Sequence, residues 1–422
     1  MWKQAQADGA LTPLGARLGP DVLKITKANF LLGYNVPGIS KPVYGNETQV
    51  GLDEHRQLAV RMLARLPGYW KQVGDAAATA PRKILVVTSG VDRAVDSGSF
   101  FVQSMTATQA SLPSAPYPYP DNGTAQTQAA GTNRFLLYFH KLVKASDLVS
   151  KTSDPLFQTY VDSQAYQSVK DSDTDLLAKQ GGLFGTAEGR LVMERLFTKT
   201  FIDKIENGTY SFANTGTFTF TSDDGKTKIA SLADAGQLLY ELYLISSAMR
   251  AEAGVDFTPF MPATRARYFS SLNDVSDFYD KGPGMTEKDE VTHKMAKILV
   301  DDLFMEVDSV AANRLDNAAK LRFAHAEILA PFATRMGLKS VEQQLPKAQT
   351  FNNNPWRGEY VSPMAANMQW DIYKNSSGKV RVKMLYNEKE TDFKAACDSA
   401  KISPASKYYD ISLLRACYGY NS

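Results

Sequence analysis

Histidine and cysteine are scarce in this sequence. Its 422 residues include four histidines and two cysteines. The histidines, His55, His140, His293 and His325, are far apart. No pair of histidines or cysteines has the spacing of a zinc finger or of an HExxH helix, which excludes zinc sites of those kinds. We predict no metal site and no cofactor.

Net charge and long apolar runs are also almost absent. Lys plus Arg total 47 against 45 acidic residues, a formal charge of +2. This balance supplies no broad cationic field, so we expect no nucleic-acid partner. The most apolar runs, Lys83–Thr88 and Leu238–Ile245, are much shorter than the roughly 20 residues that span a bilayer. We therefore predict no membrane span. The first ten residues lack the basic and apolar regions of a signal peptide.

Periodicity predicts the main secondary-structure elements. Apolar residues recur at helical spacing in Gly51–Leu66 and Ala187–Ile205. The β-branched run Lys83–Thr88, followed by turn residues, predicts a buried strand. Met368–Tyr373 and Val380–Tyr386 alternate and flank a glycine-containing loop, which predicts a β-hairpin.

The order of these elements predicts the domain organisation. Composition shifts at Ser104–Thr132, which is rich in Ser, Thr and Pro and is expected to be a functional or mobile loop. Helical periods follow, interrupted by a possible hairpin at Tyr210–Lys228. We therefore predict an α/β fold, with a mostly parallel sheet flanked by helices, formed by residues 1–103 and 311–422. Residues 104–310 would form a mostly helical inserted domain.

Two strand-to-helix junctions carry polar residues where parallel sheets bind ligands, at the carboxyl ends of strands. Arg93 follows Lys83–Thr88 at the start of a helix, and a guanidinium beside helix N–H groups suits an anion. His325 and Glu327 follow the apolar run Leu321–Ala324 and can supply a phosphate ligand and a proton donor. Each also has a plainer interpretation, as a solvated arginine or a buried structural histidine.

In combination and order, several segments resemble the histidine acid phosphatases, and most closely the multiple inositol polyphosphate phosphatases (phytases), in which HAE replaces the HD pair of classical phytases. The similarity extends from about residue 2 to residue 420 and is carried by TSGVDRAVDSGSFF (88–101), YDKGPG (279–284), LRFAHAEIL (321–329), AANMQWDIY (365–373) and LYNEKE (385–390).

The resemblance implies a phosphomonoesterase that hydrolyses inositol polyphosphates such as phytate through a phosphohistidine intermediate, with small phosphomonoesters as its partners. Position by position, Arg93 matches the arginine that clamps the phosphate. His325 matches the phosphate-binding histidine, and Glu327 matches the proton donor to the leaving alkoxide.

The two cysteines allow two interpretations. Cys397 and Cys417 are 20 positions apart, and they either form a disulfide, worth about 3 kcal/mol in the chain-entropy model, or are two unrelated buried thiols. The resemblance implies a periplasmic or extracellular compartment, and in such a compartment a disulfide between them is expected.

One part of the family pattern is missing. RHGxRxP, whose histidine attacks phosphorus in the family, occurs nowhere in these residues. We expect His55 on the exposed face of its helix, and neither His140 nor His293 follows a strand with a glycine turn. His325 is then the sole active-site histidine indicated, and no nucleophile is assigned. We expect a chain truncated before the nucleophile and its central strand. The alternative is a catalytically dead pseudophosphatase that binds phosphorylated ligands.

Overall fold

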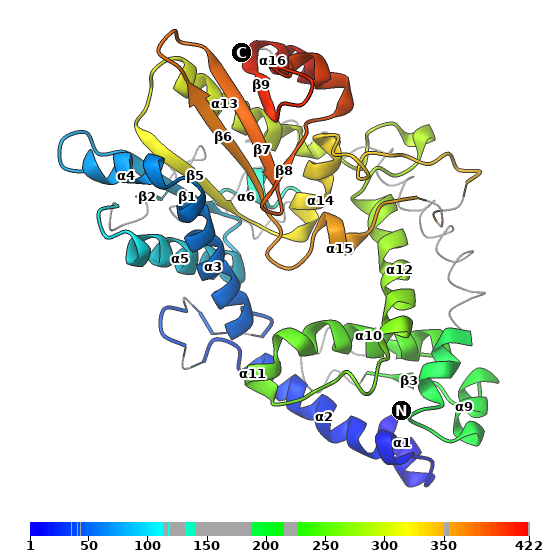
Figure 1. Cartoon of the computed structure of the whole chain (residues 1–422). Coiled ribbons are helices and arrows are strands. Elements are labelled where there is room, and N and C mark those ends of the chain that lie inside the picture. Colours follow the sequence, from blue (N-terminus) through cyan, green and yellow to red (C-terminus); the bar gives the residue numbers. More distant parts are fainter. Residues whose placement is uncertain are drawn as a thin grey trace. The chain divides into compact units, whose positions relative to one another are not determined.

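The computed structural model describes residues 1–34, 36–39, 41–42, 44–112, 117–118, 131–140, 187–214, 227–349, 351 and 354–420. The chain forms two compact units, which are coloured along the sequence in Figure 1. Met1–Val50 and Ser172–Ser276 form the first, which we call the helical unit. Gly51–Asp171 and Asp277–Ser422 form the second, which we call the sheet unit.

The elements of the helical unit are mostly helices. They are α1 (Trp2–Ala7), α2 (Pro13–Phe30), α9 (Lys199–Glu206), α10 (Leu232–Ala248), α11 (Arg250–Ala253), most of α12 (Ala263–Asp280), and the short strands β3 (Phe212–Ala213) and β4 (Lys228–Ile229). β3 and β4 lie near the two ends of the hairpin predicted over Tyr210–Lys228, and they pair antiparallel. Residues 215–226 between them lie outside the described residues.

The sheet unit contains both helices and strands. Its helices are most of α3 (Gln49–Arg65), α4 (Pro67–Asp75), α5 (Asp92–Thr108), α6 (Arg134–Leu137), α13 (Lys297–Ala311), α14 (Ala326–Arg335), α15 (Gly358–Val361) and α16 (Ile411–Tyr418), with short 3-10 helices at Thr286–Lys288, Lys294–Ala296 and Ala395–Ala400. Its strands are β1 (Lys83–Thr88), β2 (Tyr117–Pro118), β5 (Asn317–Phe323), β6 (Met368–Lys374), β7 (Val380–Tyr386), β8 (Lys389–Thr391) and β9 (Tyr408–Asp410).

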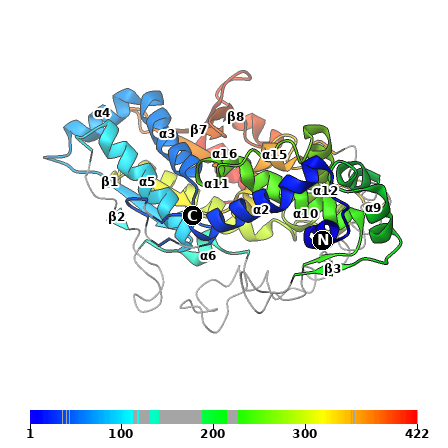
Figure 2. The same ribbon diagram turned by 90° about the horizontal axis from the view of Figure 1, so that it is seen from below.

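Helices α1 and α2 belong to the helical unit because their apolar faces are buried there. Ala5, Leu18 and Ile25 lie in its core, and Leu11 forms an antiparallel bridge with Phe197. Figure 2 shows α2 beside α11. The N-terminal segment is therefore tied to residues almost 200 positions later.

This division differs from the predicted domains. We assigned residues 1–103 and 311–422 to one domain and 104–310 to another, whereas the first 50 residues pack in the helical unit and α13 packs in the sheet unit. An amphipathic pattern shows that one face of a helix is buried, but it does not show which segment covers that face.

The helix predicted over Ala187–Ile205 is interrupted. Residues 187–193 are helical, and α9 begins only at Lys199. Between them, the carbonyl of Leu196 accepts the N–H of Thr12, and the N–H of Thr198 donates to the carbonyl of Ala10. These backbone groups form hydrogen bonds with the N-terminal segment instead of continuing the helix. Because the partner is distant in the sequence, the apolar periodicity of Ala187–Ile205 could not predict this interruption.

The α/β fold class is confirmed by a parallel sheet with strand order β2-β1-β5. α5 packs against β1 and β5, and apolar residues of α3, α4 and α5 form one core with Ile84 of β1. The predicted strand Lys83–Thr88 is reproduced residue for residue. Helices thus cover this sheet as expected.

Among the strands that the structure describes, β5 has a single neighbour, β1, which pairs with one of its two edges. On its α13 side, the ammonium of Lys320 pairs with Asp302 at 2.6 Å and with Glu306 at 3.1 Å. Arg322 also binds Asp302. The side chain of Lys320 is buried, with only 3% of its surface exposed.

The predicted C-terminal hairpin is present, but it belongs to a second, antiparallel sheet. β6 pairs with β7 from Met368↔Tyr386 to Lys374↔Val380, and β7 also pairs with β8 and β9. α13 packs against β6 and β7.

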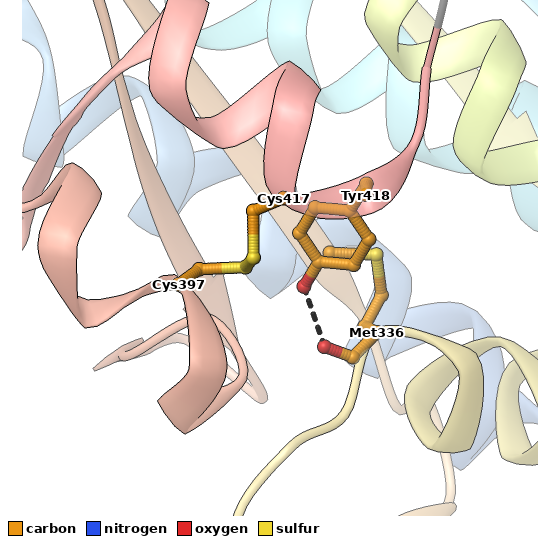
Figure 3. Close-up of a disulfide and its surroundings, with 4 residues drawn as sticks. All are labelled: Met336, Cys397, Cys417 and Tyr418. Atoms are coloured by element: carbon orange, nitrogen blue, oxygen red, sulfur yellow. Dashed lines mark hydrogen bonds between the residues drawn. A yellow bond between two sulfur atoms is a disulfide. The ribbon is translucent and has the colours of Figure 1, made fainter.

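The predicted disulfide is also formed. Figure 3 shows Cys397 bonded to Cys417. The S–S distance is 2.06 Å.

No helix among the described residues is long and apolar enough to cross a membrane.

Candidate active site

Three segments reach the same end of the parallel sheet. Thr88, the last residue of β1, is opposite Phe323, the last residue of β5. On its other side Thr88 pairs with Thr132, and its carbonyl accepts the N–H of Asn133 at 2.9 Å. The starts of α5 and α14 and the segment 131–140 therefore lie together at the carboxyl ends of β1 and β5.

Gly90 allows this close approach. Its φ is +75°, and a Cβ at this position would lie 2.7 Å from the Cγ2 of Thr132. Glycine adopts positive φ without the strain that other residues incur, and it leaves room for the neighbouring chain. The N–H of Gly90 also donates to the Oγ1 of Thr88 at 3.0 Å, which closes the turn into α5.

A short hydrogen bond links the two junctions that the sequence indicated. The Oγ of Ser89 lies 2.8 Å from the Nε2 of His325. Ser89 is fully buried, its own N–H donates to the carbonyl of Phe323, and its Oγ also accepts the N–H of Val91 at 3.3 Å. His325 precedes the first turn of α14 and is half-buried. Ser89 therefore holds the imidazole of His325 from the β1 side.

Glu327 lies in the first turn of α14, in a cationic environment. Burial is the largest influence and raises its pKa. A hydrogen bond from its own backbone N–H and the charges of His140, Lys281 and His325 outweigh burial and hold the pKa of Glu327 below its usual range. The carboxyl group is therefore ionised at neutral pH when no anion is bound.

Lys281, from the YDKGPG segment, is one of these cations. It pairs with Asp277 at 2.9 Å and with Asp280 at 3.7 Å. Burial lowers its pKa, but Asp277, Asp280 and Glu327 together raise it above the usual value. Lys281 therefore remains charged beside Glu327. The sequence motif pointed to this segment without singling out the lysine.

His140 also lies in the site, which the sequence did not predict. Its ring centroid is 6.1 Å from that of His325, and the ring of Tyr138 lies 4.7 Å from His140 and 5.3 Å from His325. The guanidinium of Arg134 lies 4.5 Å from the centroid of the Tyr138 ring. His325 is thus not the sole histidine here. The pairing of Thr132 with Thr88 brings the segment that ends at His140 to this place.

The structure agrees with the predicted position of Arg93 but not with that of His55. Arg93 is exposed in the first turn of α5, next to β1, as expected. The expectation that His55 is a surface residue was wrong. His55 is half-buried, with its ring 6.3 Å from that of Phe323, and burial lowers its pKa against the opposing charge of Glu54. His293 is buried in a turn outside the site.

The chemistry of this arrangement is that of an oxyanion site. Two imidazoles and an ammonium surround one carboxylate, and an exposed guanidinium lies on the neighbouring helix. Such donors hold phosphoryl oxygens, and the carboxyl group can carry a proton. Within the described ranges, no group of three or more His, Cys, Asp or Glu could hold a metal ion.

Solved structures of multiple inositol polyphosphate phosphatase from Bifidobacterium longum are similar over almost the whole chain. The complex with phosphate is 26% identical, with a TM-score of 0.82, covering 100% of this chain and 88% of that one. The complex with inositol hexasulfate is 26% identical, with a TM-score of 0.77 and coverage of 99% and 86%. The phytase from D. castellii, 12% identical with a TM-score of 0.50 and coverage of 96% and 74%, shares the fold.

A comparison with curated proteins gave no match. A protein-family model described as "Histidine phosphatase superfamily (branch 2)" matches residues 34–387 of this chain. This range contains the segments of Arg93, His325 and Glu327, and the match confirms the resemblance that the motifs indicated. The chain belongs to branch 2 of the histidine phosphatase superfamily.

Proposed function

We propose that this chain carries the phosphate cradle and the proton donor of an enzyme that hydrolyses inositol polyphosphates such as phytate. The observation that carries this proposal is the carboxyl group of Glu327, which is surrounded by His140, Lys281 and His325 at the strand end where Ser89 holds His325. The similar Bifidobacterium longum structures, one with phosphate and one with inositol hexasulfate, support this substrate class.

In the proposed reaction, each residue has a defined role. His325 and Arg93 bind the equatorial oxygens of the transferring phosphoryl group, where negative charge is distributed in the transition state. Glu327 donates its proton to the leaving alkoxide, which would otherwise be a poor leaving group. A bound phosphate ester opposes the cations around Glu327, so binding raises the pKa of this carboxyl group and favours the acid form.

The proposed nucleophile is the histidine of an RHGxRxP motif, which forms a phosphohistidine intermediate and is not contained in these 422 residues. Among the described strands, only β1 pairs with β5, which leaves the other edge of β5 for a further strand and supports this part of the proposal. A further parallel strand on that edge would end beside His325. The disulfide between Cys397 and Cys417 supports a periplasmic or extracellular location.

Reading the coding DNA upstream of Met1 tests the nucleophile. An in-frame RHGxRxP supports the proposal, and a stop codon directly before Met1 contradicts it. The extended protein is expected to release phosphate from phytate and to accumulate an acid-labile phosphohistidine. Binding of inositol hexasulfate without any turnover by the extended protein would instead identify a pseudophosphatase.

A further inference from the structure

His140 is held in place by buried neighbours. Asn133 accepts the N–H of Leu136 at 2.9 Å and so caps α6. Leu136, Leu137 and Phe139 are all buried, so the segment that ends at His140 is anchored in the protein interior. His140 itself is half-buried. A half-buried side chain on an anchored segment is suited to binding, because little freedom remains to be lost.

The spacing of the two imidazoles suits a bridging oxyanion. The ring centroids of His140 and His325 are 6.1 Å apart and the ring planes are inclined at 65°. This separation is too great for a direct hydrogen bond between ring nitrogens. Tyr138 contacts both rings edge-on, so it sets their spacing.

The local charges also favour an anion at this position. His140, Lys281 and His325 each act on the single carboxylate of Glu327, and only Lys281 has two carboxylates beside it in Asp277 and Asp280. Asp277 and Asp280 offset the charge of Lys281, so when both imidazoles are protonated, two imidazolium charges face the single carboxylate of Glu327. A phosphate dianion supplies the missing negative charge.

From this geometry we propose that His140 is a second phosphate-binding histidine of the site, which donates a hydrogen bond to the same phosphoryl group as His325. The proposal rests on the proposed function, and it identifies a residue that the family motifs do not contain. His140 binds without forming a covalent bond to phosphorus.

The test is calorimetric titration of the chain with inositol hexasulfate and with inorganic phosphate, at about pH 5.5 and about pH 7.5. His140→Asn is expected to weaken binding about tenfold at the lower pH, with less effect at the higher pH, where an imidazole is mostly neutral. His140→Gln, whose longer side chain places its uncharged amide N–H about as far from the backbone as the imidazole Nε2, is expected to bind with intermediate affinity. His55→Asn is the matched control, since it removes another half-buried histidine that packs on Phe323.

A second readout separates binding from folding. Removal of the His140 charge is expected to raise the pKa of Glu327, measured by NMR of the carboxyl carbon, while the thermal midpoint of unfolding stays unchanged. If His140→Asn is folded and keeps wild-type affinity at both pH values, the proposal is overturned. Failure of the wild-type chain to bind either anion contradicts the proposed function instead. Phosphohistidine at position 140 in the extended protein would overturn the non-covalent role.

Discussion

The hydroxyl of Ser89 lies 2.8 Å from the Nε2 of His325, and this hydrogen bond joins the ends of two neighbouring parallel strands. The two residues are 236 positions apart in the sequence. Because Ser89 is completely buried, its hydroxyl is fixed in place. It therefore determines where the imidazole of His325 points.

Ser89→Ala is expected to destabilise the protein by about 0.5–1.5 kcal/mol, the usual net loss for one hydrogen bond, and to weaken phosphate binding as His325 gains freedom. Urea unfolding and calorimetry measure the two effects. Ser104→Ala is the matched control, because that hydroxyl also makes a hydrogen bond, to the carbonyl of Arg56 at 2.9 Å. Equal phosphate affinity in wild type and Ser89→Ala would show that Ser89 does not orient His325.

Arg93→Ala is expected to reduce affinity for phosphate and vanadate by about tenfold or more, because a charge-assisted hydrogen bond to the oxyanion is lost. The free energy of unfolding of Arg93→Ala should stay within about 0.5 kcal/mol of the wild-type value, since the Arg93 side chain is exposed. Lys288→Ala, a change at a residue of a 3-10 turn in the same unit, serves as the control. Unchanged affinity in Arg93→Ala would remove this residue from the cradle.

Glu327→Gln is expected to slow the extended enzyme on phytate far more than on an activated aryl phosphate, which needs no proton at its leaving group. The lowered pKa of Glu327 also predicts a pH dependence. The protonated acid of the free enzyme is lost as pH rises through that pKa, so kcat/KM for poor leaving groups should be highest in acid. This limb of the pH profile should disappear in Glu327→Gln. An equal loss on both substrates would rule out Glu327 as the acid.

His293 predicts a loss of stability in acid. Burial is the main cause that lowers its pKa to about 4, with Glu290 opposing and Arg335 adding to the effect. In the unfolded chain, histidine titrates near 6.5. As pH falls from about 6.5 to about 4, the unfolded state binds the proton first, and stability falls by up to about 3 kcal/mol.

The comparison that isolates this effect is His293→Phe against wild type. The variant is expected to lose less free energy of unfolding between about pH 7 and about pH 4.5, whatever its stability at neutral pH. Urea unfolding at several pH values measures the difference. Parallel curves for the two proteins would show that His293 does not contribute to the acid sensitivity.

The disulfide predicts a thermodynamic effect as well. Replacing Cys397 and Cys417 by serine opens a loop of 20 residues, and about 3 kcal/mol of stability should be lost in the chain-entropy model. The hydrogen bond from the Tyr418 hydroxyl to the carbonyl of Met336, 2.6 Å long, still ties α16 to α14 in the variant. Chemical denaturation checks the value, and an unchanged midpoint would contradict it.

Local patterns were sufficient for the elements that hold the predicted site residues. The apolar run Lys83–Thr88 and the turn that follows placed Arg93 in the first turn of α5. The apolar residues before Ala324 likewise placed His325 and Glu327 at the start of α14. Strands and helix starts are set by neighbouring residues, so their position could be predicted without knowledge of the rest of the chain.

Long-range contacts decided what the patterns could not show. Ala187–Ile205 has a helical period, yet its middle binds residues 10–12 instead. His140 follows the short helix α6 and has no motif of its own, and it reaches His325 because Thr132 pairs with Thr88. In both cases the partner lies far away in the sequence.

The sequence by itself determined the family, the α/β class and the residues of the two strand-to-helix junctions. These properties are encoded in periodicity and in short motifs that act over a few residues. Only the tertiary structure decided the division into two units, the hydrogen bond from Ser89 to His325 and the presence of His140 in the site. Strand pairing and core packing bring together segments that are far apart in the sequence, such as Ser89 and His325, which are 236 positions apart, and no local pattern specifies which distant partner a buried face or a strand edge will find.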